Sequence, residues 1–124
     1  LFTSALVGAG PDFVSEIDES DGSIALFSPK IAVLNNVSLD HKSMEELRTL
    51  FGDFLARADA AVLNLDNKEA AALRPRAKKA LTYGLDAEAD FGAEAIAVAP
   101  YGVSFTAIDR RSGARARVSL KVPG

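Results

Sequence analysis

The stretch KIAVLNNVSLDHKSMEELRTLFGDFL, residues 30–55, contains the strongest strand pattern of the chain, followed by its clearest helix pattern. Residues 30–37 predict a strand, because residues 31–34 form a continuous apolar run that is typical of a strand covered on both faces of a sheet. Ser43 and Glu46 then form a capping box, a common start of a helix. The next residues place apolar side chains at the spacing of one helix face, at Met44, Leu47, Leu50, Phe51, Phe54 and Leu55. This strand and this helix predict an α/β fold.

The segments on either side of this unit extend the alternation of strands and helices. Residues 13–18 (FVSEID) are a candidate strand upstream, and residues 60–66 (AAVLNLD) and 79–84 (KALTYG) predict two strands downstream. Between the downstream strands, Asp66 followed by Glu69 predicts the start of a second helix. Because crossover connections are right-handed, this order predicts a mostly parallel sheet with crossover helices.

The last third of the chain has a different pattern. Residues 90–99, 103–109 and 114–122 are alternating or β-rich runs. They are separated by the turn sequences Pro-Tyr-Gly at 100–102 and Arg-Arg-Ser-Gly at 110–113. The sequence therefore predicts an antiparallel β meander after the parallel sheet.

Composition limits the classes of protein to which the chain can belong. Its 124 residues suffice for one domain, and 48% apolar with 25% charged residues is the mix of a soluble globular protein. The formal net charge of −3 argues against nucleic acid as a partner, and the absence of a long apolar run argues against a membrane span. The chain contains no cysteine, which excludes disulfides and thiolate chemistry.

Four acidic residues are crowded into SEIDESDGS, residues 15–23: Glu16, Asp18, Glu19 and Asp21. On a strand, Glu16 and Asp18 would share a face, and the carboxyl ends of parallel strands form the ligand crevice of an α/β sheet. Two interpretations follow from these residues alone. The segment is either part of a magnesium site or a solvated acidic turn with polar caps.

A second polar segment, NNVSLDH at residues 35–41, comes directly after the strongest strand. It contains His41, the only histidine of the chain. At the carboxyl edge of the sheet, Asp40 would orient the imidazole and Asn36 would bind a ligand oxygen. The alternative is that His41 is a capping or surface residue in front of the helix.

Taken together, EIDESDGS (16–23) and PKIAVLNNVSLDH (29–41) resemble the central domain of the Mur ligases, the ATP-dependent amide-forming enzymes of peptidoglycan synthesis. The family pattern is E-x-D-E-S-D, a buried strand, and then N-[IV]-x-x-D-H, and His41 follows Glu16 at the matching separation of 25 residues. The later segments AAVLNLDN, ALTYG and VSLKVPG keep the order of the family. The helix MEELRTLFGDFL contains no lysine, as in the alanine-adding branch and the related muropeptide ligases.

The resemblance implies the P-loop-type central-domain fold and a cytoplasmic ATP-dependent acid–amino-acid ligase. In that chemistry ATP phosphorylates a carboxylate, and an amine then attacks the acyl phosphate. The substrates implied are a UDP-N-acetylmuramate-type nucleotide sugar and an amino acid, L-alanine in the nearest branch, or a peptide. Glu16 and His41 match the catalytic magnesium ligands of the family, and Asn36 and Asp40 match the flanking positions that bind the nucleotide cofactor.

The resemblance also implies that residues 1–124 are a fragment of that domain. The phosphate-loop segment is expected upstream and a C-terminal domain downstream, so the fragment alone is expected to be inactive and to expose surface that promotes self-association. Two other interpretations remain open at this stage. One is a non-catalytic binding or assembly module that keeps the fold, and the other is a folate- or cyanophycin-type ligase of the same superfamily.

Overall fold

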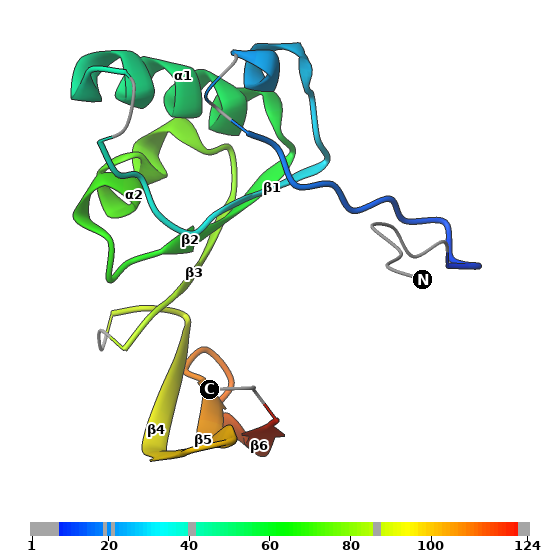
Figure 1. Cartoon of the computed structure of the whole chain (residues 1–124), viewed down its shortest axis with the longest axis vertical. Helices are drawn as coiled ribbons and strands as arrows, with labels where there is room; N and C mark the ends of the chain where they lie inside the picture. Colours follow the sequence, from blue (N-terminus) through cyan, green and yellow to red (C-terminus); the bar gives the residue numbers. More distant parts are fainter. Residues whose placement is uncertain (1–7, 19, 21, 40–41, 86–87, 122–124) are drawn as a thin grey trace.

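The computed structural model describes residues 8–18, 20, 22–39, 42–85 and 88–121. Six strands form one sheet in the order β1-β2-β3-β4-β5-β6, which is also their order in the chain (Figure 1). The elements are η1 Ser23–Leu26, β1 Ile31–Leu34, α1 Met44–Arg57, β2 Ala60–Asn64, α2 Lys68–Ala72, η2 Arg74–Arg76, β3 Ala80–Tyr83, β4 Phe91–Ala99, β5 Gly102–Asp109 and β6 Ala114–Leu120. None of the described helices is long and apolar enough to cross a membrane.

Strands β1, β2 and β3 pair in parallel, and α1 and α2 form the crossovers between them. Strand β4 joins β3 in parallel through one residue pair, Tyr83 with Phe91. Strands β4, β5 and β6 then pair antiparallel as a meander. The predicted fold class, a mostly parallel sheet with crossover helices followed by an antiparallel meander, is therefore confirmed.

The hydrophobic core lies between the two helices and one face of the parallel strands. Helix α1 begins with the predicted capping box, in which Ser43 Oγ accepts from Glu46 N at 3.2 Å and Glu46 Oε2 accepts from Ser43 N at 2.9 Å. The predicted apolar stripe of α1 faces the sheet. Its buried residues form one cluster with alternate residues of β1 and β2: Leu47, Phe51, Phe54, Leu55, Ala32, Leu34, Ala61 and Leu63.

The opposite face of the parallel strands is open in the described part of the chain. Ile31 and Val33 of β1 are 62% and 58% exposed. β1 is also an edge strand, since it pairs with β2 alone among the described strands. Parallel strands are normally covered on both faces, so this face is an exposed apolar surface on an otherwise ordinary α/β layer.

Two expectations from the sequence were wrong. Residues 13–18 form no strand, and Phe13 and Val14 are 90% and 93% exposed. An apolar pair becomes a strand only where a neighbouring strand accepts its hydrogen bonds, and the described residues provide none here. The cap of α2 is Asn67 rather than Asp66, because Asn67 Oδ1 accepts the hydrogen bond of Ala70 N at 2.9 Å.

Candidate functional site

The carboxyl ends of β1, β2 and β3 meet at one edge of the sheet. The strand register pairs Leu34 with Leu63 and Asn64 with Tyr83, so Asn35, Asn64 and Tyr83 lie at the same level across this edge. The hydroxyl of Tyr83 donates a hydrogen bond to Asn35 Oδ1 at 2.6 Å, which joins the ends of β1 and β3 across β2. This is the edge at which open α/β sheets bind their ligands.

The turn after β2 is tied to both of its neighbours. Asn67 Oδ1 accepts a hydrogen bond from the backbone N–H of Val37, at 3.3 Å, in the segment that leaves β1. On the other side, the carboxylate of Asp66 accepts from Leu85 N at 2.9 and 3.1 Å, directly after β3. Gly84 permits this contact, because it adopts φ +155° and a Cβ there would lie 2.7 Å from Asp66 Oδ1.

Tyr83 is a neutral hydrogen-bond donor at this edge, because a phenol is protonated at neutral pH, and its hydroxyl donates to Asn35. The pKa of the Tyr83 hydroxyl is raised above its usual value, first by partial burial and then by the nearby carboxylate of Asp66. The described residues at this edge thus include the neutral hydroxyl of Tyr83, the side-chain amides of Asn35 and Asn67, and the carboxylate of Asp66.

Of the predicted site residues, Glu16 and Asn36 are described and both are exposed. Asn36 lies between Asn35 and Val37, the two residues that are tied to Tyr83 and Asn67. Asp40 and His41 lie outside the described residues. Glu16 and Asn36 share no hydrogen bond in the part of the chain that the structure describes, and that part contains no group of three or more metal-ligating side chains.

The acidic segment nevertheless lies beside the segment that follows β1. Lys42 Nζ, at the start of the α1 region, donates to the carbonyl oxygen of Ser20 at 3.3 Å. Within the acidic segment, Asp18 Oδ1 accepts from Ser20 N at 2.8 Å, and Ser23 Oγ donates to Asp18 O at 3.3 Å. Asp18, Ser20 and Ser23 are therefore joined by local hydrogen bonds, and Ser20 contacts Lys42, the residue that follows the second polar segment.

Sequence reasoning placed Asn35 at this edge but missed Tyr83 and Asn67 and the contacts that they make there. The residues were inside or next to predicted elements, but their contacts depend on strand register, which the sequence pattern did not provide. A usable signal did exist, since polar residues at the ends of three consecutive parallel strands must lie at one edge.

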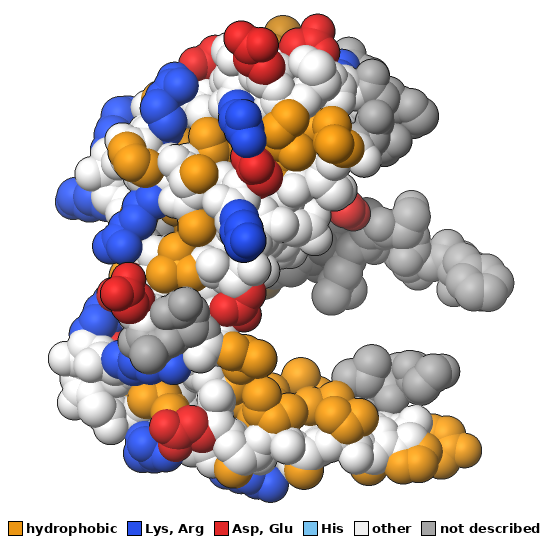
Figure 2. All heavy atoms as spheres, turned by 90° about the vertical axis from the view of Figure 1, so that its left-hand side faces the viewer, with side chains coloured by type: hydrophobic (Ala, Val, Ile, Leu, Met, Phe, Trp, Pro, Cys, Tyr) orange, Lys and Arg blue, Asp and Glu red, His pale blue; other side chains and the backbone are white. Residues whose placement is uncertain are grey.

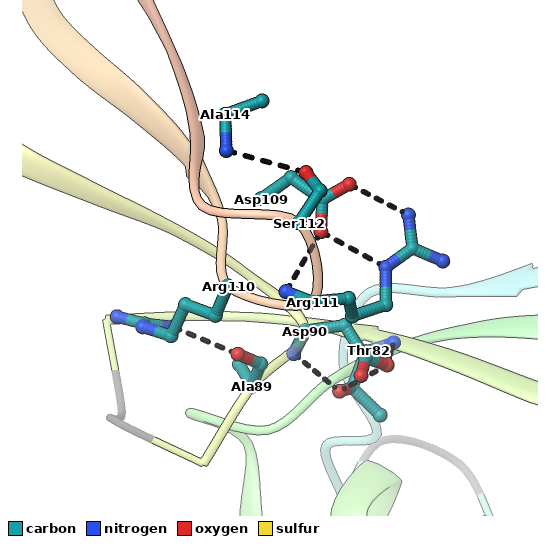
Figure 3. Close-up of polar contacts among 8 residues, drawn as sticks. All are labelled: Thr82, Ala89, Asp90, Asp109, Arg110, Arg111, Ser112 and Ala114. Atoms are coloured by element: carbon teal, nitrogen blue, oxygen red, sulfur yellow. Dashed lines mark hydrogen bonds and ion pairs between the residues drawn. The ribbon is translucent and has the colours of Figure 1, made fainter.

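A second polar cluster joins β3 to the meander (Figure 3). Thr82, which is 1% exposed, donates its backbone N–H and its hydroxyl to Asp90 Oδ2 at 2.9 and 3.0 Å, and its hydroxyl oxygen accepts from Asp90 N at 2.9 Å. Nearby, Arg111 Nε donates to Asp109 Oδ1 at 2.9 Å, and this ion pair lowers the pKa of Asp109 to about 2. These groups satisfy one another, so the cluster stabilises the junction between β3 and the meander.

Comparison with known proteins identifies the family. Residues 13–124 match the model of the Mur ligase middle domain. The chain is 40% identical over 133 aligned residues to UDP-N-acetylmuramate–L-alanine ligase of Geobacter sp. (strain M21) and 37% identical over 132 residues to that of Sorangium cellulosum. Both alignments cover 100% of this chain and 28% of the relative, so the chain spans just over a quarter of the length of these curated relatives.

Solved structures show the same fold at lower identity. MurF from Acinetobacter baumannii superposes with a TM-score of 0.66 at 16% identity, over 84% of this chain and 24% of that one. A murein peptide ligase from Psychrobacter arcticus gives a TM-score of 0.61 at 17% identity, over 89% of this chain and 28% of that one. The family match, the relatives and the shared fold agree, and the chain belongs to the Mur ligase family as a part of its middle domain.

Proposed function

We propose that the protein containing this chain is a cytoplasmic ATP-dependent ligase that joins L-alanine to a UDP-N-acetylmuramate-type nucleotide sugar in peptidoglycan precursor synthesis. The observation that carries this proposal is the 40% identity, over the whole chain, to a relative named UDP-N-acetylmuramate–L-alanine ligase. The absence of lysine from α1 also fits the alanine-adding branch. The phosphate-loop and C-terminal parts of the enzyme are proposed to lie outside these 124 residues.

In this proposal Glu16 and His41 hold Mg²⁺, while Asn36 and Asp40 contact the nucleotide. Carboxylate oxygens such as those of Glu16 are ligands that Mg²⁺ prefers, and His41 is assigned to the metal through its match to the family pattern. Bound Mg²⁺ would neutralise charge on the phosphoryl group during its transfer from ATP to the substrate carboxylate. The contact of Lys42 with Ser20 supports this assignment, since it holds the segment that contains Glu16 beside the residues that follow His41.

The experiment uses the full-length protein with Mg²⁺, ATP, UDP-N-acetylmuramate and L-alanine, and measures phosphate release and amide product. We expect release that depends on L-alanine. Glu16→Gln should lower kcat/KM by about 100-fold or more, because a metal ligand loses its charge. Glu45→Gln is the matched control, since Glu45 is an exposed acid of α1 outside the proposed site.

Two results would contradict the proposal. A wild-type protein that releases no phosphate in response to L-alanine would remove the substrate assignment. A Glu16→Gln variant with the activity and Mg²⁺ dependence of the wild type would remove Glu16 as a metal ligand. The 124-residue chain alone is expected to show no ATP turnover.

A further inference from the structure

The segment that leaves β1 is held from two sides by side chains of other elements. On one side Asn35 Oδ1 accepts the hydroxyl hydrogen bond of Tyr83, at 2.6 Å. On the other side the N–H of Val37 donates to Asn67 Oδ1 at 3.3 Å. Asn36 is the single residue between these two anchor points, so its backbone position is determined from both directions.

The hydrogen bond from Tyr83 of β3 reaches across β2 to Asn35. Tyr83 pairs with Asn64 in the register, and Asn35 lies one position beyond the last pair of β1 and β2. A phenol is long enough to reach over the intervening strand, and a half-buried hydroxyl is a donor that finds a partner. A phenol keeps its proton over the physiological range, so the hydroxyl of Tyr83 remains a donor to Asn35.

In the β2–α2 turn, one oxygen of Asn67 accepts two hydrogen bonds. Asn67 Oδ1 accepts from Val37 N and also from Ala70 N, at 3.3 and 2.9 Å. The same side chain therefore caps α2 and holds the segment that leaves β1 at Val37. Val37 itself is 4% exposed, so its backbone N–H has little access to water as an alternative partner.

We propose that Tyr83 and Asn67 are positioning residues of the ligase, which fix residues 35–37 so that the side chain of Asn36 is aimed at the bound nucleotide. This inference rests on the proposed function, in which Asn36 contacts the nucleotide. Neither residue touches the reacting atoms in this proposal. Their contribution is to remove the alternative positions of a turn that would otherwise have to be ordered when ATP binds.

The first test compares Tyr83→Phe with Tyr101→Phe in the full-length protein. Both changes delete one phenol oxygen, but Tyr101 is 81% exposed in the turn before β5. We expect Tyr83→Phe to raise the KM for ATP by about 3- to 10-fold with a smaller change in kcat, as the loss of one hydrogen bond predicts. Tyr101→Phe should have the kinetics of the wild type.

The second test uses the two functions of Asn67. Asn67→Ala removes the shared acceptor and should raise the KM for ATP, whereas Asn67→Asp keeps an acceptor oxygen and should restore most of the wild-type KM. Melting temperatures of all variants are measured in parallel. A lower melting temperature with unchanged KM in Tyr83→Phe and Asn67→Ala would overturn the inference, because it would show a purely structural role.

The two proposals fail in different ways. If the wild type releases no phosphate in response to L-alanine, the proposed function is wrong and the positioning role falls with it. If the wild type is active and Tyr83→Phe keeps its KM for ATP, the proposed function stands and the positioning role is wrong.

Discussion

Strands β1 to β3 and strands β4 to β6 belong to one sheet, but their side chains are buried to very different extents. In β1 and β2 every second residue is buried beneath α1 and α2. In the meander, Ile108 is the one buried strand residue. In Figure 2, hydrophobic side chains gather on the surface of the lower part of the molecule, where the meander lies.

The difference shows that two kinds of interaction stabilise the same sheet. The parallel part depends on burial of apolar surface against its helices. The meander depends on its two antiparallel ladders and on polar pairs, including Arg115 with Glu94 and Arg117 with Ser104. Substitutions of one chemical type should therefore have unequal effects in the two regions.

The largest expected effect is in the core of the parallel part. Leu55 of α1 is fully buried, and Leu55→Ala should lower the free energy of unfolding by about 2–5 kcal/mol through lost burial and the cavity left behind. The control is Leu120→Ala in β6, where the side chain is 47% exposed and the cost should stay below about 1 kcal/mol. Urea denaturation of both variants measures the difference, and equal costs would contradict the comparison.

An intermediate effect is expected at the junction of the two parts. Asp90→Ala removes the acceptor of both the N–H and the hydroxyl of Thr82, a residue that is 1% exposed. Leaving such groups without partners should cost about 1–3 kcal/mol. Amide hydrogen exchange at Thr82 should accelerate in Asp90→Ala and stay slow in Thr82→Ser, which keeps a hydroxyl. Unchanged exchange in Asp90→Ala would show that the cluster does not hold the junction.

The smallest effect is expected at the ion pair of Asp109 and Arg111, whose guanidinium also lies 4.5 Å from the centre of the Phe91 ring. The pair lowers the pKa of Asp109 from 3.8 to about 2, so the folded state favours the charged carboxylate. Its stabilisation is therefore complete above about pH 4 and is lost as the pH falls through 2.

Asp109→Asn tests this pH dependence. The difference in melting temperature between wild type and variant should be constant above pH 5 and should shrink between pH 4 and pH 2. An NMR titration of the Asp109 carboxyl carbon gives the midpoint directly. A midpoint near 4 would show that the ion pair does not persist in solution.

Local patterns were sufficient to predict most elements of the fold. The strand within residues 30–37 and helix α1 were predicted because an apolar run, a capping box and a helical stripe all lie within one short stretch, although β1 ends at Leu34. The failure at residues 13–18 has the opposite cause, since an apolar pair forms a strand only beside a partner that lies elsewhere in the chain. The choice of Asn67 over Asp66 as the cap was also not local, because Leu85 N uses the Asp66 carboxylate.

The candidate site was predictable in part. Motifs predicted Glu16, Asn36, Asp40 and His41, which stay predictions, and Lys42, just after the second polar segment, contacts Ser20 in the acidic segment. Tyr83 and Asn35 could not be paired without the register, because they are 48 residues apart in sequence.

Asn67 connects the start of α2 to the segment that leaves β1. A helix of five residues is too short to persist without its cap and its packing. One oxygen accepts from both Ala70 N and Val37 N. Helix α2 and the segment that contains Asn36 are therefore linked through one side chain, and removing that oxygen should weaken both the start of the helix and the position of the segment.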